Sequence, residues 1–266
     1  MSKKKCTIES ILLKDKTLGR NISWKMGHPI TLEDLPDIKP RYQKTVEEQQ
    51  TRTKGKAEVF TPSWICNEMN NNLDDDWFGV KNVFNTPKGK TWVPTKKVIF
   101  PEGKSWQNYI SRRVLEITCG EGAFLVSTYD TVTGEIIPLP SRIGIIDRKL
   151  RVISENTDSK EDWLKWAIKA YETTYGYEYQ GDSLYICRKF MYTSFIDYYK
   201  VKFGEEPGAE DLKMIANIIS WNIFQMDGLR YIVPYTNEYA TLKNWDKNRT
   251  ERFIDIILEA GDLKAS

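Results

Sequence analysis

Short apolar runs alternate with amphipathic stretches from residue 113 to the end of the chain. The apolar runs have the length and composition of buried strands, and the stretches between them carry apolar residues on one helical face. Strands that alternate with helices at this spacing predict an α/β fold with a mostly parallel sheet and helices on both of its faces. The predicted strands are Arg113–Thr118, Arg142–Asp147, Tyr177–Gln180 and Trp221–Met226, and the predicted helices are Lys149–Asn156, Glu161–Tyr175, 186–203, Asp211–Ile219 and Arg249–Leu258.

The first 57 residues lack this alternation and are interrupted by three prolines. They predict an irregular N-terminal arm with a short helix around Arg41–Arg52. The simplest interpretation of the arm is a solvated extension that wraps the rest of the protein. Residues 58–266 are then expected to form one domain, with an insertion at 78–112.

Composition narrows the possible chemistry. The 266 residues include one histidine, His28, so histidine-rich metal sites are excluded. The four cysteines show neither the C-x-x-C spacing of a structural zinc site nor a disulfide framework. The protein is therefore expected to lie in the cytoplasm and to bind no metal ion. No apolar run is long enough for a membrane span. The cysteines are Cys6, Cys66, Cys119 and Cys187.

Positive charge is concentrated in one segment. The net charge of the chain is only +2, yet residues 81–113 hold eight Lys or Arg and one acid, Glu102. Aromatic residues are interleaved with these cations, a combination that suits phosphate contacts and base stacking. The alternative is a β-hairpin insertion whose rings cover the core. The candidate nucleic-acid-binding residues are Lys88, Lys90, Trp92, Lys96, Lys97, Lys104 and Trp106.

A Gly-x-Gly turn follows the first predicted strand. Gly120 and Gly122 allow the backbone to bend sharply and to approach a ligand closely. A strand, such a turn and an apolar helix start are the local layout of a cofactor-binding crossover. Asp147 ends the second predicted strand, where an acid either bonds a ribose hydroxyl or caps the next helix. Ligands bind at the carboxyl ends of parallel strands, so the two glycines, Asp147 and Asp182 predict one ligand site.

Four stretches resemble, in composition and order, the adenine-specific DNA methyltransferases of restriction–modification systems. More narrowly, the chain resembles the short proteins usually called restriction endonuclease subunit M. That family has an F-T-P motif, a glycine loop that often reads D-P-A-C-G-S-G-x-F, a strand-acid-helix unit and an acid near the adenine of the cofactor. The corresponding stretches here are Ala57–Pro62, Leu115–Leu125, Arg142–Asn156 and Tyr179–Leu184.

The resemblance implies a Rossmann-like methyltransferase fold with S-adenosylmethionine as cofactor. A sulfonium ion is positively charged, so carboxylates and aromatic rings bind it better than a loop that binds phosphate does. By resemblance, Asp147 bonds the ribose and Asp182 bonds the amine of the adenine ring. The residues implied at the methionine end are Phe60, Thr61 and Pro62, and those implied in the loop beneath it are Glu116, Cys119, Gly120 and Gly122.

The catalytic motif of the family is absent. That motif, Asn/Asp-Pro-Pro-Tyr/Phe, hydrogen-bonds the target amine and stacks on a flipped adenine. The nearest candidates here are Asn222, Phe224 and Tyr235, which lie in Ser220–Gln225 and in the Pro-Tyr pair that ends at Tyr235. Ile232 stands where the second stretch needs a hydrogen-bond acceptor, and its side chain has none.

Three hypotheses follow. The first is an S-adenosylmethionine-dependent DNA adenine N6-methyltransferase, or the modification subunit of one, acting on double-stranded DNA. The second is a catalytically silent, methyltransferase-like subunit that binds DNA or cofactor. The third is a methyltransferase for protein, RNA or a small molecule. About 30 residues follow Tyr235, less than a target-recognition domain needs, so a partner subunit is expected to supply specificity or cleavage.

Overall fold

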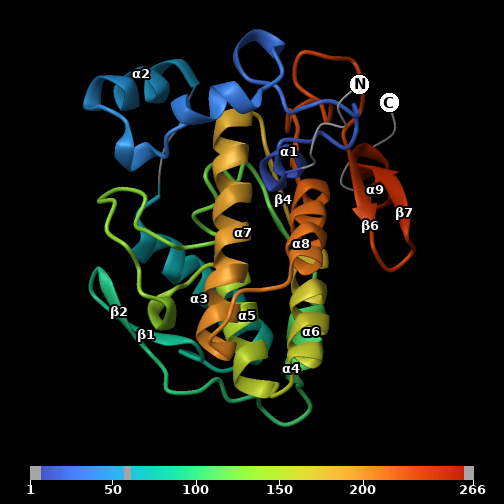
Figure 1. The fold of residues 1–266 in the computed structure, drawn as a ribbon. Coiled ribbons are helices and arrows are strands. Elements are labelled where there is room, and N and C mark those ends of the chain that lie inside the picture. Colours follow the sequence, from blue (N-terminus) through green and yellow to red (C-terminus); the bar gives the residue numbers. More distant parts are fainter. Residues whose placement is uncertain (1–6, 57–60, 261–266) are drawn as a thin grey trace.

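A parallel three-stranded sheet forms the centre of the fold (Figure 1). The computed structural model describes residues 7–56 and 61–260. The protein is a mixed α/β fold with a parallel sheet, as the apolar pattern predicts. The strands are β3 (Val114–Glu116), β4 (Thr174–Glu178) and β5 (Ile223–Gln225), and they lie in the spatial order β3-β4-β5.

Helices cover one face of this sheet. Local sequence sets their limits: the side chain of Ser159 accepts a hydrogen bond from Asp162 N and caps α6, and α7 stops at Gly204 in the left-handed conformation. Helices α6, α7 and α8 contact the strands, and α5 packs on α6 and α7. The bounds are α5 (Ile145–Asn156), α6 (Lys160–Glu172), α7 (Gly181–Phe203) and α8 (Ala209–Asn222).

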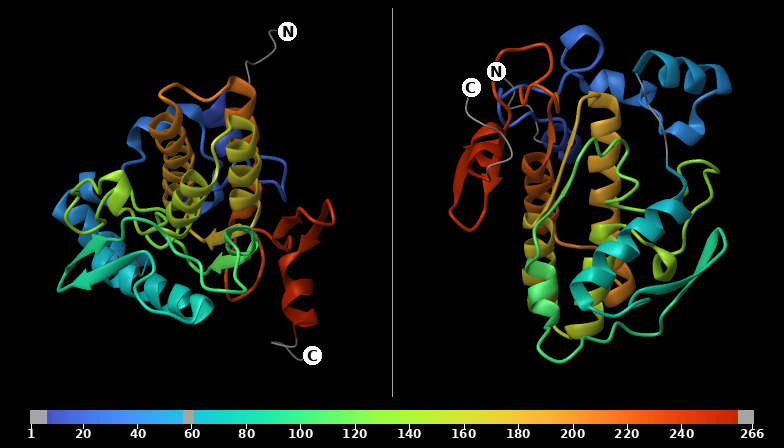
Figure 2. Two further views of the ribbon diagram at one scale, coloured as in Figure 1. Left: turned by 90° about the horizontal axis from the view of Figure 1, so that it is seen from below. Right: turned by 180° about the vertical axis from the view of Figure 1, so that it is seen from behind.

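The opposite face is covered by a C-terminal hairpin and a short helix instead of a second helical layer (Figure 2). The ring of Phe253 lies 5.8 Å from Tyr177 and 5.9 Å from Phe224, both on the sheet. In the described part of the chain, the helical cover predicted for this face is limited to one short helix. The C-terminal elements are β6 (Thr241–Asn244), β7 (Arg249–Arg252) and α9 (Phe253–Glu259). The helix predicted from Arg249 therefore begins at Phe253, and the four residues before it form a strand.

The strand predicted over Arg142–Asp147 is also wrong. Gly144 is the N-cap of α5, which begins at Ile145. Ile146, Leu150 and Ile153 are fully buried at helical spacing, so the apolar run is the first turn of a buried helix. A short apolar run does not by itself distinguish a strand from such a turn. The helix predicted directly after the glycine turn is absent too, since residues 123–138 form turns and isolated bridges.

The N-terminal arm is part of the core rather than only a solvated extension. Leu12, Leu13, Ile22 and Ile30 are fully buried. The buried guanidinium of Arg188 on α7 donates hydrogen bonds to the carbonyls of Leu12 and Lys14. The described elements of the arm are α1 (Ile8–Leu12), three short 3-10 helices (Lys25–Gly27, Leu32–Asp37, Arg41–Gln43) and α2 (Val46–Lys56).

The basic segment forms the predicted hairpin and then a short helix. Gly89 makes the turn of the hairpin with φ 59°. Phe84, Phe100 and Tyr109 from this segment pack with two rings of α3, Trp77 and Phe78. The elements are α3 (Ser63–Phe78), which precedes the hairpin, β1 (Asn85–Lys88), β2 (Thr91–Pro94) and α4 (Trp106–Ser111).

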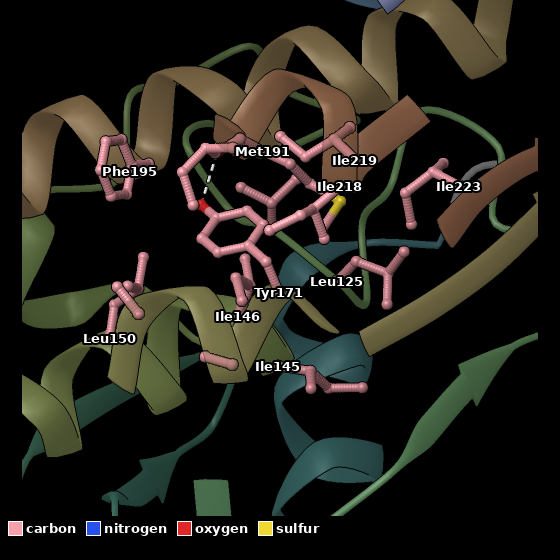
Figure 3. Packing of buried hydrophobic residues seen from close by; sticks show 14 of the residues in the cluster. Leu125, Ile145, Ile146, Leu150, Tyr171, Met191, Phe195, Ile218, Ile219 and Ile223 are labelled. Carbon is pink, nitrogen blue, oxygen red and sulfur yellow. Dashed lines mark hydrogen bonds between the residues drawn. The ribbon is translucent and has the colours of Figure 1, made fainter. Parts of the chain in front are cut away.

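The main core lies between the helices and the sheet (Figure 3). Tyr171 of α6 is fully buried there, and its hydroxyl donates a 2.7 Å hydrogen bond to the carbonyl oxygen of Met191 on α7. This bond satisfies a polar atom that burial would otherwise penalise. None of the helices in the described residues is both long and apolar enough to cross a membrane.

Candidate functional site

The loop after β3 holds three residues in the left-handed region of backbone space. Thr118, Gly120 and Gly122 have φ values of 50°, 56° and 92°. The two glycines adopt this conformation without a Cβ clash, whereas Thr118 is β-branched and is strained there. Strain of this kind costs about 1–3 kcal/mol and concentrates at ligand sites.

The two glycines of the loop have different surroundings. A Cβ on Gly122 would lie 2.7 Å from Cys187 Sγ, so this glycine allows the loop to pack against α7. A Cβ on Gly120 would meet no atom within 4 Å. Gly120 therefore exposes its backbone to open space at the carboxyl edge of the sheet, which is where a ligand can approach it.

Glu178 lies at the carboxyl end of β4 and joins that strand to the glycine loop. Its Oε2 accepts a hydrogen bond from Gly120 N at 2.9 Å, and its Oε1 accepts one from Gln180 N at 2.8 Å. Burial raises the pKa of this carboxyl group, and the backbone N–H groups oppose the rise. Each oxygen still has a lone pair for a donor on a ligand.

Glu116 ends β3 at the same edge of the sheet. Burial raises the pKa of its carboxyl group to about 7. No described residue forms a hydrogen bond or an ion pair with it. Its nearest ionisable neighbours include Cys66 on α3, whose pKa is raised to about 12 by burial first and by Glu116 second. A half-buried carboxyl group without a partner favours a positively charged ligand, because such a ligand would stabilise the ionised form.

Asp227 follows the third strand, two residues after Gln225. Its Oδ1 accepts hydrogen bonds from the backbone N–H groups of Leu229 and Arg230, and no described residue donates a hydrogen bond to its Oδ2. Gly228 next to it allows a close approach of β4, since a Cβ there would lie 2.9 Å from the ring of Tyr177. Each of the three strands thus ends at or within two residues of an acid.

Asp147 does not join this edge. It lies in the first turn of α5 and is fully buried. Its Oδ2 accepts hydrogen bonds from Ser127 N and Ser127 Oγ, and its Oδ1 accepts one from Ser194 Oγ. A carboxylate enclosed in this way has no access to a ribose. The structure therefore does not support Asp147 as the ribose-binding acid, because the strand predicted to end there is a helix. Asp147 is instead a structural acid near the start of α5.

Asp182 is close to the edge but is already engaged. It lies in the first turn of α7, and its Oδ2 accepts a 2.6 Å hydrogen bond from Arg52 on α2. The salt bridge brings the N-terminal arm to the carboxyl edge of the sheet. Thr61 is also tied internally, because its carbonyl accepts a hydrogen bond from Thr131 Oγ1, and Pro62 is the N-cap of α3. Phe60 lies outside the described residues.

Cys119 lies buried inside the glycine loop. A hydrogen bond with Cys187 of α7, followed by burial, raises its pKa well above the ordinary value for a thiol. The Cys119 thiol therefore stays protonated and is no nucleophile at neutral pH. Its role in the loop is packing: the Cβ that Gly176 lacks would lie 3.3 Å from Cys119 Sγ.

The structure does not gather the three catalytic candidates. Asn222 lies at the amino end of β5, where its Nδ2 donates to Tyr171 O and its Oδ1 accepts from Trp245 Nε1. Phe224 is buried in the sheet. Tyr235 alone is near the carboxyl edge: it is half exposed, and its ring lies 5.9 Å from that of Tyr179, the residue after β4. None of the three supplies an acceptor beside the glycine loop.

The candidate nucleic-acid residues separate into two groups. Lys88, Lys90, Lys96 and Lys97 are exposed on the hairpin and just after it. The others are used within the fold: Lys104 bonds the carbonyl of Trp77 and lies over its ring, Trp106 packs on Trp166 at 4.8 Å, and Trp92 Nε1 donates to Ser141 O. The rings of Trp92 and Trp106 thus have contacts within the fold of the kind that the alternative describes.

Two residues of the edge, Glu178 and Asp227, were missed from the sequence. The rule that an acid follows the second strand is sound, but Arg142–Asp147 is not a strand, because α5 begins at Ile145. Applied to the strand that does form, Thr174–Glu178, it selects Glu178. The same rule applied to the third strand selects Asp227.

No protein family, curated protein or solved structure matches this chain. Within the residues that the structure describes, no three His, Cys, Asp or Glu side chains are grouped so as to hold a metal ion. The site is therefore defined by its own geometry: a strained glycine loop and three acids at one edge of a parallel sheet.

Proposed function

We propose that this edge binds S-adenosylmethionine. Doubly wound folds bind a cofactor at the carboxyl ends of their strands, with a glycine turn after the first strand and an acid after the second that bonds the ribose. Gly120 and Glu178 have these two positions. The proposal replaces Asp147 with Glu178 as the ribose-binding acid and Asp182 with Asp227 as the acid for the adenine amine.

The hydrogen bond from Gly120 N to Glu178 Oε2 is the observation that carries the proposal. It holds the carboxylate directly beside the part of the loop that is open to solvent. The residues present fit the cofactor. Ribose hydroxyls and an adenine amine are donors, and the free lone pairs of Glu178 and Asp227 are acceptors. Glu116, which has no partner among residues 7–56 and 61–260, is suited to the positive methionine end.

When bound, the cofactor would supply an activated methyl group. The resemblance to adenine-specific methyltransferases and the exposed lysines of the hairpin favour double-stranded DNA as the substrate, with transfer to adenine N6, and favour a modification subunit of a restriction–modification system. The exposed positions of Lys88, Lys90, Lys96 and Lys97 suit contacts with phosphates, which position DNA without reading its sequence.

The alternative is a catalytically silent subunit that binds cofactor or DNA. It is favoured by the enclosure of Asn222, whose amide bonds Tyr171 and Trp245 instead of facing the loop. Both forms of the proposal share the same cofactor site. They differ in whether a target adenine is methylated, alone or with another subunit.

Calorimetric titration of the full chain with S-adenosylmethionine tests the proposal. We expect saturable one-to-one binding that Asp227→Asn weakens. No binding by a folded protein would reject the cofactor site. Transfer of a labelled methyl group from the cofactor to DNA, with this chain alone and with a second subunit, then distinguishes an active modification subunit from a silent one.

A further inference from the structure

A cavity of about 460 Å³ lies between the β1–β2 hairpin and the segment 130–141, on the side of the fold from which the hairpin projects (Figure 1). The first turn of α3 forms its third wall. A cavity of this size accommodates a small ligand or one nucleotide. Its lining residues do not include Gly120, Glu178 or Asp227, so the cavity and the proposed cofactor site share none of these residues.

Two tryptophans of the cavity have no aromatic partner. Of the nine tryptophans in the chain, Trp64 and Trp92 are the two that neither pair with an aromatic ring nor lie beneath a cation within residues 7–56 and 61–260. Both line this cavity, and both are half-buried. Trp92 Nε1 donates a 2.7 Å hydrogen bond to Ser141 O, which holds that ring in one orientation through its edge rather than its face. Rings held in this way are platforms on which a base can stack.

The rim of the cavity is apolar and exposed. Ile136 is 81 % exposed and Val132 is 56 % exposed, although both are large aliphatic residues. The turn before them is fixed, because Asp130 Oδ1 accepts hydrogen bonds from the backbone N–H groups of Val132 and Thr133 at 2.9 Å and 2.8 Å. Exposed apolar side chains on a fixed turn, beside two tryptophans, are typical of a surface that a ligand covers.

Asp130 supplies a hydrogen-bond acceptor at the wall of the cavity. Its Oδ2 accepts a 2.9 Å hydrogen bond from Ser63 N, and the Ser63 side chain lies beside it. The carboxylate oxygen and this hydroxyl can together accept a donor from a ligand. Burial acts to raise the pKa of Asp130, but the hydrogen bonds from Thr133 and Ser63 outweigh it and hold the pKa below its ordinary value. A base that suits this group has an exocyclic amine, as cytosine has and thymine has not.

Charge distinguishes a nucleotide from a cationic ligand. Two tryptophans and an acid would also suit an amine or a guanidinium group. Residues 85–97, however, contain four lysines and no acid. Lys90 lines the cavity and forms no hydrogen bond or ion pair with a described residue. A free cation would be repelled by these lysines, whereas a nucleotide brings a phosphate to them. Glu135, on the opposite wall, adds a second acceptor for the base.

We propose that this cavity holds one unpaired base of a nucleic acid, packed against Trp64 and Trp92, with its exocyclic amine on Asp130 and its phosphate beside Lys90. A paired base does not enter, because its amine is bonded to the opposite base and its faces are stacked in the duplex. That the strand belongs to the DNA substrate rests on the proposed function; the cavity itself rests on its own residues.

Binding of two single-stranded hexamers tests the proposal. Fluorescein-labelled (dC)6 and (dT)6 are titrated with the full chain at pH 8, where cytosine is neutral, and anisotropy gives both affinities. We expect (dC)6 to bind about tenfold more tightly, because only cytosine can donate an amine hydrogen bond to the carboxylate. Trp64→Ala should weaken (dC)6 binding about fivefold or more, since it removes a stacking ring. Equal affinities of the two hexamers, or full affinity in a folded Trp64→Ala variant, would overturn the proposal.

Ile136→Glu and Val93→Glu form a matched pair. Each adds one negative charge at an exposed apolar position, but only Ile136 lines the cavity. Val93 follows Trp92 on β2, so its side chain points to the other face of the hairpin. Ile136→Glu should abolish the preference for (dC)6, and Val93→Glu should retain it. Urea unfolding checks that both variants fold, which the exposure of the two side chains favours.

Two results with Ile136→Glu contradict the proposal. A preference for (dC)6 that survives the substitution means that the base does not enter the cavity. The other result is binding of N-acetylargininamide that Ile136→Glu strengthens, because the cavity is then a site for a cation.

Calorimetry with S-adenosylmethionine on the same variants separates this proposal from the preceding one. Ile136→Glu should bind the cofactor as the wild type does. A (dC)6 preference that depends on Ile136, in a protein that does not bind the cofactor, rejects the cofactor site and leaves the cavity assignment intact. Cofactor binding without any preference between the hexamers does the reverse. Loss of cofactor binding in Ile136→Glu alone would assign the cavity to the cofactor and overturn the proposal.

Discussion

Gly120 N donates a 2.9 Å hydrogen bond to Glu178 Oε2, and this contact joins the loop of one strand to the acid that ends the next. The two residues are 58 positions apart in the sequence. The contact sets the width of the proposed site, because it fixes how far the open backbone of Gly120 lies from the carboxylate. A change at either residue should therefore affect both the loop and the ligand.

Glu178→Gln should weaken S-adenosylmethionine binding by about tenfold to a hundredfold. A hydrogen bond to a charged group contributes about 1.5–3 kcal/mol, and glutamine has one acceptor oxygen where the carboxylate has two. Calorimetry measures the affinity, and a urea titration checks that the variant folds. Asp182→Asn is the matched control, since Asp182 faces Arg52 rather than the loop. Equal losses in both variants would argue against Glu178 as the ribose acid.

Glu116→Gln should stabilise the protein at alkaline pH. Burial raises the pKa of Glu116 from 4.5 to about 7, so the folded state holds the proton more tightly than the unfolded state. The stability this proton contributes is fully present below pH 4.5 and is lost as the pH rises through about 7, a difference of about 3 kcal/mol. Urea unfolding at pH 4.5 and pH 8 checks this: the variant and the wild type should agree at the lower pH and differ at the higher one. The same difference at both pH values would contradict a half-buried carboxyl group with a raised pKa.

Gly122→Ala should destabilise the fold more than Gly120→Ala. Both glycines have positive φ, which costs an alanine about 1 kcal/mol or more. Only Gly122 adds a clash, because its new Cβ would lie 2.7 Å from Cys187 Sγ. Thermal unfolding measures the two free energies. We expect Gly120→Ala to remain folded and to lose cofactor affinity, since the methyl group occupies the approach to the loop. A larger loss of stability at Gly120 would mean that the loop is packed differently.

Charge reversal at Lys96 and Lys97 should weaken binding to a DNA duplex and flatten its dependence on salt. Each phosphate contact that is lost removes a slope of about 0.9 from the plot of log affinity against log salt. Fluorescence anisotropy at several salt concentrations measures both quantities. Lys189→Glu is the control, because Lys189 is exposed on α7 and lies 13 residues before Lys202, which lines a cavity with Lys96. Unchanged affinity in the double variant would reject the hairpin as a DNA surface.

Trp106→Ala should reduce stability without changing DNA affinity. Its ring packs on Trp166 at 4.8 Å instead of facing solvent. Removing a buried aromatic side chain costs about 3–5 kcal/mol when it is fully enclosed and less here, because Trp106 is half-buried. Urea unfolding and the anisotropy assay on the same sample distinguish the two effects. A loss of DNA affinity in a fully folded variant would restore the stacking role.

The sequence predicted the helices better than the site. Long amphipathic stretches such as Lys160–Glu172 are defined by many apolar positions, and the structure confirms them. The run before Asp147 contains too few residues to separate a strand from a buried helical turn. That one error separates the predicted ribose acid from the proposed one by 31 positions, because the acid rule is applied to whichever strand is taken as second. The contacts that decide the site, such as Gly120 with Glu178, are long-range and leave no local pattern.

The aromatic residues of the basic segment show a different limit. In the sequence, Phe84 and Tyr109 cannot be distinguished from rings that face a ligand. In the structure they are buried against Phe78. Whether a ring packs in the core or stacks on a base depends on which distant residues fold against it. The exposed lysines, by contrast, could be named from the sequence, because a cation in a turn rarely finds a buried partner.

The amide of Gln225 binds both backbone groups of Ser23 across 202 residues of sequence, with its Oε1 accepting from Ser23 N and its Nε2 donating to Ser23 O. The two residues can therefore be joined only after the strand that holds Gln225 has been made. Contacts between positions so far apart in the sequence slow folding, because a long loop must close before they form. Until that loop closes, the apolar residues of the arm, such as Ile22 and Ile30, lack part of their cover in the core and are the ones most in need of a chaperone.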